Sequence, residues 1–212
     1  MGLARAERLR LADLAERLGP DAPTLCTGWT TRDLVAHLVL RDRQPLAVPG
    51  TVLPFAAPLT DALQRRLDGV GYDDLLDRLR EGPPRWSPVG LPGLEEQANL
   101  VEFFVHCEDV RRAQPDGAGA RHDVPELDDP LWARLRLLGR VLVRRARGVA
   151  VHALRRDGAS LVLRGGRGPV VTVCGTPGEL TLLCWGRGEV AEVDVTGEPA
   201  AVAAFEAARL GP

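Results

Sequence analysis

The segment that decides the fold is ANLVEFFVHCEDVRRAQP, residues 98–115. Its apolar residues recur at helical spacing, which predicts the second half of a helix from about Leu94 to Ala113. The segment also carries Glu102 and His106, which are four residues apart, so their side chains lie on one face of the helix. An apolar face that packs in a core would not ordinarily carry a carboxylate and an imidazole.

The polar residues of this helix form a single stripe. At 100° per residue they fall within a wedge of about 80°, and they are Asp109, Glu102, His106 and Asn99. The wedge has apolar residues on both sides, namely Leu94, Ala98, Val101 and Val105 on one side and Val110 and Phe103 on the other. Because apolar residues flank the stripe, we expect it to face the interior of the protein.

An earlier helix repeats this arrangement. It should begin near Thr31, because Thr30 and Asp33 have the spacing of an acidic capping box. In RDLVAHLVLR (residues 32–41) apolar residues surround the helix axis, so this helix should be largely buried. Its polar positions form a second stripe, which consists of Asp33, His37 and Arg41.

Two inward polar stripes can satisfy each other by sharing a cation, since buried charges are costly unless they are paired or bound to metal. We therefore expect His37, Glu102 and His106 to be metal ligands. Three protein ligands leave a coordination position open, as in catalytic zinc sites. Asp33 could orient the His37 imidazole, and Asp109 could be a fourth ligand or a second orienting group.

The same residues also fit a reading without metal. An i,i+4 pair of glutamate and histidine is common on helices, and short motifs of this kind match by chance. In that case Glu102 would pair directly with His106, and His37 would pair with Asp33, as a stabilising network of ion pairs.

The chain predicts an α+β protein with two parts. Residues 1–115 contain four helical segments, including one or two helices between residues 59 and 82, and no convincing strand. A polar, turn-rich linker covers residues 116–130. Residues 131–212 show a helix followed by short strands and two further helices, including one with Thr176 as N-cap, which indicates a small α+β domain.

Composition narrows the function classes. The 212 residues carry a formal charge of −2 with acids and bases interleaved, which gives no electrostatic footprint for nucleic acid or a membrane surface. No apolar run is long enough to span a bilayer and no signal peptide is apparent, so we expect a cytoplasmic protein. The four cysteines lack metal-ligand spacing and are interpreted as small buried thiols. Cys107 lies about 140° from Glu102 on the helical wheel.

GWTTRDLVAHL (residues 28–38), followed by VEFFVHCEDVRRA (residues 101–113), resembles the mycothiol-dependent maleylpyruvate isomerase family. That family belongs to the DinB-like superfamily of metal-binding four-helix bundles. The N-terminal segments are similar to an actinobacterial branch of this superfamily. The resemblance implies a DinB-like bundle over residues 1–115, with His37, Glu102 and His106 as ligands of a divalent metal, most often zinc.

The resemblance extends to GTPGELTLLCWGRG (residues 175–188), which matches a segment of the family's C-terminal domain. It implies that Arg187 helps to hold mycothiol or a substrate carboxylate. An arginine at this place can also serve the fold alone, by bonding the last carbonyl groups of a helix.

Two functions follow from these expectations. The first is a metal-dependent enzyme that uses a low-molecular-weight thiol such as mycothiol for isomerisation or S-transfer on a small electrophile. The second is a non-catalytic protein that binds a metal or a small ligand, in which case Asp109 would complete the coordination shell. Either protein would be a monomer or a homodimer.

Overall fold

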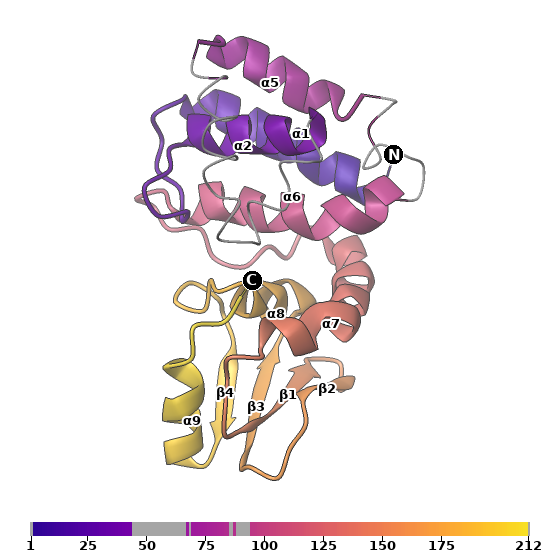
Figure 1. Ribbon diagram of the computed structural model, residues 1–212, viewed down its shortest axis with the longest axis vertical. Helices are drawn as coiled ribbons and strands as arrows, with labels where there is room; N and C mark the ends of the chain where they lie inside the picture. The colour runs from indigo at the N-terminus through magenta and orange to yellow at the C-terminus, as the bar shows by residue number, and fades with distance from the viewer. Residues whose placement is uncertain (1, 44–66, 68, 85–86, 88–93, 212) are drawn as a thin grey trace. The chain divides into compact units, whose positions relative to one another are not determined.

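The computed structural model describes residues 2–43, 67, 69–84, 87 and 94–211. It consists of two compact units, Met1–Ala118 and Gly119–Pro212 (Figure 1). The described part of the first unit is helical, and the second contains a four-stranded sheet with helices. The predicted α+β class is therefore confirmed. The first part of the helical segment predicted between residues 59 and 82 lies outside the described residues.

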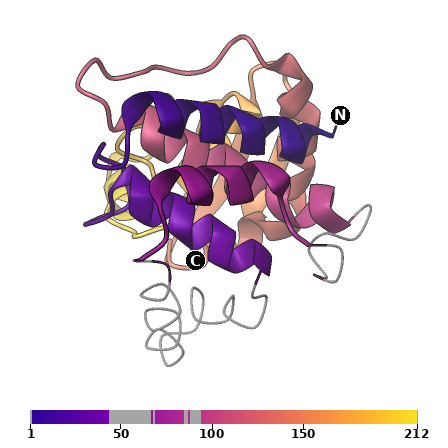
Figure 2. The same cartoon turned by 90° about the horizontal axis from the view of Figure 1, so that it is seen from above.

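The described part of the first unit contains four helices (Figures 1 and 2): α1 (Leu3–Leu18), α2 (Thr31–Arg43), α5 (Tyr72–Glu81) and α6 (Leu94–Arg112). Helix α1 packs against α6 and α5, and α2 packs against α5. Helix α6 covers the predicted range to within one residue at its end, and α2 begins at the predicted Thr31.

Side chains from all four helices form the core of this unit. Its buried members include Leu11, Ala12, Ala15, Leu34, Val35, Leu38, Leu75, Leu76, Leu79, Phe103, Cys107 and Val110. Burial of one such leucine contributes about 1.5–3 kcal/mol relative to an exposed position. Cys107 belongs to this core, as expected for a small buried thiol. The core holds α2 and α6 in fixed rotation about their axes, which decides where their polar residues point.

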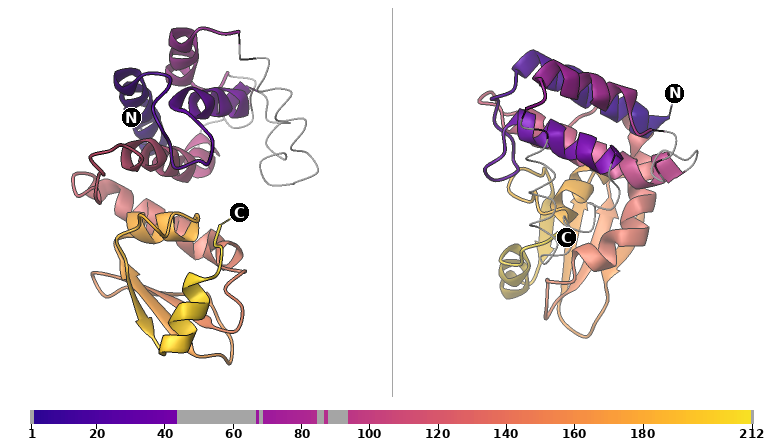
Figure 3. Two further views of the ribbon diagram at one scale, coloured as in Figure 1. Left: turned by 90° about the vertical axis from the view of Figure 1, so that its left-hand side faces the viewer. Right: turned by 45° about the horizontal axis from the view of Figure 1, so that its top comes forward.

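The second unit starts with the 3₁₀ turn η4 (Pro125–Leu127) and α7 (Asp128–Leu142). Its strands are β1 (Ala150–Arg155), β2 (Ser160–Arg164), β3 (Val170–Gly175) and β4 (Asp194–Gly197), in the order β2-β1-β3-β4. Strands β1 and β3 are parallel, and the two outer pairs are antiparallel. Helix α9 (Pro199–Glu206) packs on β3 and β4 (Figure 3).

Helix α8 (Pro177–Cys184) begins as its sequence predicts. The Thr176 hydroxyl accepts a bond from the Glu179 amide, and Pro177 occupies the first helical position. Helix α7 begins at Asp128, so the predicted linker of residues 116–130 contains η4 and the first residues of α7. In the part of the chain that the structure describes, no helix combines the length and apolar character needed to cross a membrane.

Candidate metal centre

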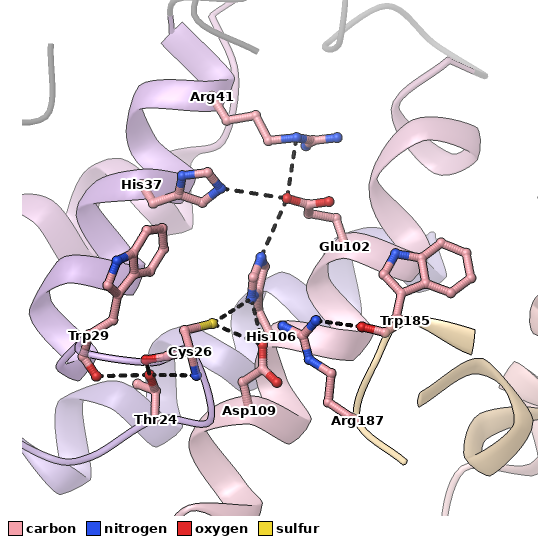
Figure 4. A network of polar contacts seen from close by, with 10 residues as sticks. All are labelled: Thr24, Cys26, Trp29, His37, Arg41, Glu102, His106, Asp109, Trp185 and Arg187. Carbon is pink, nitrogen blue, oxygen red and sulfur yellow. Dashed lines mark hydrogen bonds and ion pairs between the residues drawn. The ribbon is translucent and has the colours of Figure 1, made fainter. Parts of the chain in front are cut away.

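Helices α2 and α6 bring the three predicted ligands together (Figure 4). Nε2 of His37 lies 3.8 Å from Oε1 of Glu102, and Nε2 of His106 lies 3.4 Å from the same oxygen. The ligand atoms of the three residues all lie within 4.8 Å of one another. The inward direction of both stripes is thus visible in the structure, while metal binding itself stays a prediction.

The start of α2 determines where His37 points. Oδ2 of Asp33 accepts bonds at 2.8 Å from both the amide and the hydroxyl of Thr30, which confirms the capping box. The Asp33 carboxylate therefore caps the helix, and a role in orienting His37 stays a prediction. The His37 ring packs against Trp29, with 5.1 Å between ring centroids, and its side chain is 8% exposed.

Asp109 contacts His106 at Nδ1, the ring nitrogen that does not face Glu102. Its carboxylate is fully buried, and Oδ2 lies 2.9 Å from Nδ1 of His106. A carboxylate at Nδ1 favours a proton on that nitrogen, so Nε2, on the side of Glu102, is the atom that can bind a metal once the metal displaces its proton. In a metal site, this is how a carboxylate fixes the orientation of a histidine ligand.

Cys26 is a neighbour of the site that sequence reasoning missed. Its Sγ lies 3.3 Å from Oδ2 of Asp109 and 3.9 Å from Nδ1 of His106, so these three residues form a second set of donor atoms. A neutral imidazole offers one lone pair, so His106 can serve only one of the two sets at a time. The available signal was the place of Cys26 in the loop just before the His37 helix.

Two further polar residues border Glu102. Nε of Arg41 lies 3.5 Å from Oε1 of Glu102, and NH1 of Arg41 donates to Oδ1 of Asn99. Asn99 is fully buried, and the Arg41 side chain is 12% exposed. Three nitrogen atoms, from His37, His106 and Arg41, therefore surround one carboxylate oxygen.

This arrangement shifts two pKa values in opposite directions. Burial alone would raise the pKa of Glu102, but the Arg41 guanidinium and the bonds from His106 and His37 hold it well below its usual range. Burial alone would lower the pKa of His106, but Asp109, Cys26 and Glu102 raise it well above its usual range. The cluster is thus built to keep Glu102 ionised.

The residues fit a divalent metal such as zinc. Zinc takes imidazole nitrogen and carboxylate oxygen at about 2.0–2.2 Å, which in a tetrahedral site places neighbouring ligand atoms roughly 3.3–3.6 Å apart. The distances of 3.4 Å and 3.8 Å to Oε1 of Glu102 are close to this spacing. The Glu102 side chain is 26% exposed, so solvent reaches this residue of the cluster.

Arg187 lies in the second unit, after the end of α8. Its NH1 donates to the Trp185 carbonyl at 2.7 Å, which satisfies a carbonyl at the helix C-terminus (Figure 4). This contact matches the structural alternative stated for Arg187. Its predicted role in holding a cofactor or substrate stays a prediction.

Comparison with solved structures shows what the fold is similar to. A histidine-to-alanine mutant of the mycothiol-dependent maleylpyruvate isomerase superposes with a TM-score of 0.59 and 18% sequence identity, over 92% of this chain and 90% of that chain. Another structure of the mycothiol-dependent maleylpyruvate isomerase gives a TM-score of 0.53 and 16% identity over the same shares. These likenesses establish a shared fold. Among curated proteins, none matches the chain.

The sequence model described as the mycothiol maleylpyruvate isomerase N-terminal domain matches residues 4–154. This range includes both helices of the candidate metal centre. It covers most of the 212 residues, and so the chain belongs to the mycothiol maleylpyruvate isomerase N-terminal domain family.

Proposed function

We propose that this protein is a cytoplasmic, divalent-metal-dependent enzyme that uses a low-molecular-weight thiol, such as mycothiol, to isomerise or conjugate a small electrophile. One observation carries the proposal: two imidazole nitrogens and one carboxylate oxygen, from α2 and α6, lie within 4.8 Å of one another, and the carboxylate is partly exposed. Zinc is the metal that this donor set suits best, because it combines nitrogen and carboxylate ligands with an open position. Family membership supports the choice of a thiol as cofactor.

The chain's residues have distinct tasks in this proposal. His37 and His106 present Nε2, and Glu102 presents its carboxylate. Asp109 keeps the His106 proton on Nδ1, so that Nε2 stays available. A metal bound here would supply a Lewis acid that lowers the pKa of a thiol in the open position. Arg187 is proposed to hold an anionic group of cofactor or substrate.

The reaction itself needs no nucleophile from the protein. The thiol releases its proton to water, and the sulfur bonds to one carbon of an activated carbon–carbon double bond, whose π electrons move to the other carbon as a stabilised carbanion and re-form the double bond if the sulfur leaves. In isomerisation the same carbon–sulfur bond then breaks, and the thiolate leaves after the substrate has rotated. In S-transfer the bond remains, and the carbanion formed by the addition takes up a proton from water.

The first test is metal content of the full chain, purified without a metal-binding tag. We expect about one zinc per chain, and its loss in both His37→Ala and Glu102→Ala. His122→Ala is the matched control, because it removes an exposed imidazole in the second unit and should keep the metal. A parent protein that takes up no divalent metal on titration would refute the proposal.

The second test adds mycothiol and an electrophile such as maleylpyruvate to the metal-loaded protein. We expect catalysed turnover that requires both thiol and metal and that is lost in Glu102→Ala. Metal binding without any thiol-dependent turnover would instead favour a non-catalytic metal-binding protein.

A further inference from the structure

Arg41 and Asn99 continue the two polar stripes beyond the proposed ligands. Arg41 follows His37 by four residues on α2, and Asn99 precedes Glu102 by three residues on α6, so each lies one turn from a ligand. The Arg41 guanidinium faces Glu102 with Nε and donates to Oδ1 of Asn99 with NH1. One cation thus contacts both the proposed ligand carboxylate and a buried amide.

Asn99 has a donor that no described residue satisfies. Its Nδ2 is buried, and among the residues that the structure describes no acceptor lies within hydrogen-bonding distance. Because Oδ1 is the atom that faces Arg41, the amide nitrogen lies on the other branch of the side chain. Buried donors are nearly always paired in proteins, since desolvation without a partner is costly. An acceptor that binds beside Arg41 would remove this cost.

The charges around Glu102 point to what that acceptor is. Metal ligation requires neutral imidazoles; in that state Glu102 and Asp109 contribute −2 and Arg41 contributes +1, so the protein groups sum to −1. A divalent cation changes the sum to +1. A metal that takes Glu102 as ligand also withdraws the carboxylate charge that Arg41 faces. The guanidinium, a planar donor that matches carboxylates, then favours an anion as its new partner.

We propose that Arg41 and Asn99 form an anion subsite beside the metal, suited to a carboxylate group of the substrate, and that the two binding events strengthen each other. The inference rests on the metal site of the proposed function and makes no use of the thiol. Coupling of this kind is reciprocal: if the metal improves anion binding by some factor, the anion improves metal binding by the same factor.

The experiment measures zinc affinity of the full chain by competition with a chromophoric chelator, with and without acetate as the probe, at constant ionic strength set by sodium perchlorate. For the parent, we expect saturating acetate to tighten zinc binding by about fivefold or more. Arg41→Met should bind zinc at least about tenfold more tightly than the parent without acetate, because no cation then competes for Glu102. Acetate should change its affinity by less than about twofold.

Two further variants separate this role from a structural one. Arg43→Met removes the same charge from α2 at a residue that pairs with Glu81 instead, and it should behave as the parent does. Asn99→Leu keeps the Arg41 charge but removes the amide, so the effect of acetate should fall while zinc affinity without acetate stays within about threefold. Asn99→Leu also serves as the test if Arg41→Met does not fold.

Two results would overturn the inference: an acetate effect of the parent's size in both Arg41→Met and Asn99→Leu, or weaker zinc binding by Arg41→Met without acetate. Lack of zinc binding by the parent would overturn it together with the proposed function. Acetate-dependent zinc binding in a protein without thiol-dependent turnover would remove the proposed enzyme and leave the anion subsite in place.

Discussion

The helical unit holds two sets of buried charged side chains that differ in how their charges are matched. Arg8 of α1 pairs with Asp42 of α2, both are almost fully buried, and the guanidinium stacks over the Phe103 ring. Glu108 of α6 likewise binds Arg111 and Arg112, at 2.7 and 2.6 Å. In this set arginines pair with each carboxylate, and both carboxylates are almost fully buried.

The cluster around Glu102, on α2 and α6, has a different arrangement. Three nitrogens surround one carboxylate oxygen, a second carboxylate lies behind His106, and the side chain of Glu102 is partly exposed. The buried ion pairs of Asp42 and Glu108 are explained by the fold alone. The partly exposed cluster brings two imidazole nitrogens to one carboxylate oxygen, which are the donor types of the proposed metal site. This difference is the main reason to propose a function for α2 and α6.

The largest effect is expected where the matched pair is broken. Arg8→Ala removes the cation that Asp42 faces in the core, and the loss of one partner of a buried pair costs about 3–5 kcal/mol of unfolding free energy. Urea denaturation measures this cost. The double variant Arg8→Met with Asp42→Leu should recover most of it, and zinc bound per folded chain should not change. A cost below about 1 kcal/mol for Arg8→Ala would show that this pair is not structural.

An intermediate effect on zinc affinity is expected when neighbouring residues of α6, one from each set, are substituted. Asp109→Asn weakens the hold on Nδ1 of His106, and zinc affinity should fall about 10–100-fold with little loss of stability. The adjacent variant Glu108→Gln should do the reverse: it should lower the unfolding free energy and leave zinc affinity within about threefold. Equal zinc affinities in the two variants would end the distinction between the sets.

The smallest effect is expected at Cys26. If His106 presents Nε2 to the metal, Cys26→Ser should change zinc affinity by less than about threefold, because the thiol lies on the Nδ1 side. The cobalt-loaded parent should then show no near-ultraviolet charge-transfer band from a thiolate. Such a band, lost in Cys26→Ser and kept in Cys107→Ala, would instead show that Cys26, His106 and Asp109 hold the metal.

Regular periodicity explains what could be predicted from the sequence. The angular positions of Glu102 and His106 follow from 3.6 residues per turn, and apolar borders predict which way they face. The proximity of α2 and α6 was predicted because each helix carries an inward polar stripe, and buried polar side chains require partners. The helix starts at Thr31 and Pro177 followed from capping residues, whose hydrogen bonds are local.

The sequence decides less where contacts are long-range or where one residue fits two roles. Asp33 has the spacing both to cap its helix and to reach His37, and a sequence does not decide between them. Cys26 reaches Asp109 only because the loop folds back on α6, through bonds such as Thr24 Oγ1 to the Trp29 carbonyl. Loop paths of this kind depend on tertiary contacts rather than on periodicity.

The loop before α2 is attached to α6 by a main-chain bond, from the Leu25 amide to the Asp109 carbonyl at 3.0 Å. That carbonyl belongs to the last turn of α6. Because backbone atoms make the attachment, it survives most exchanges of loop side chains. Substitutions of the loop side chains beside His106, such as Cys26, can therefore occur without moving the loop. We expect members of this family that differ in thiol or substrate to differ first at these loop residues.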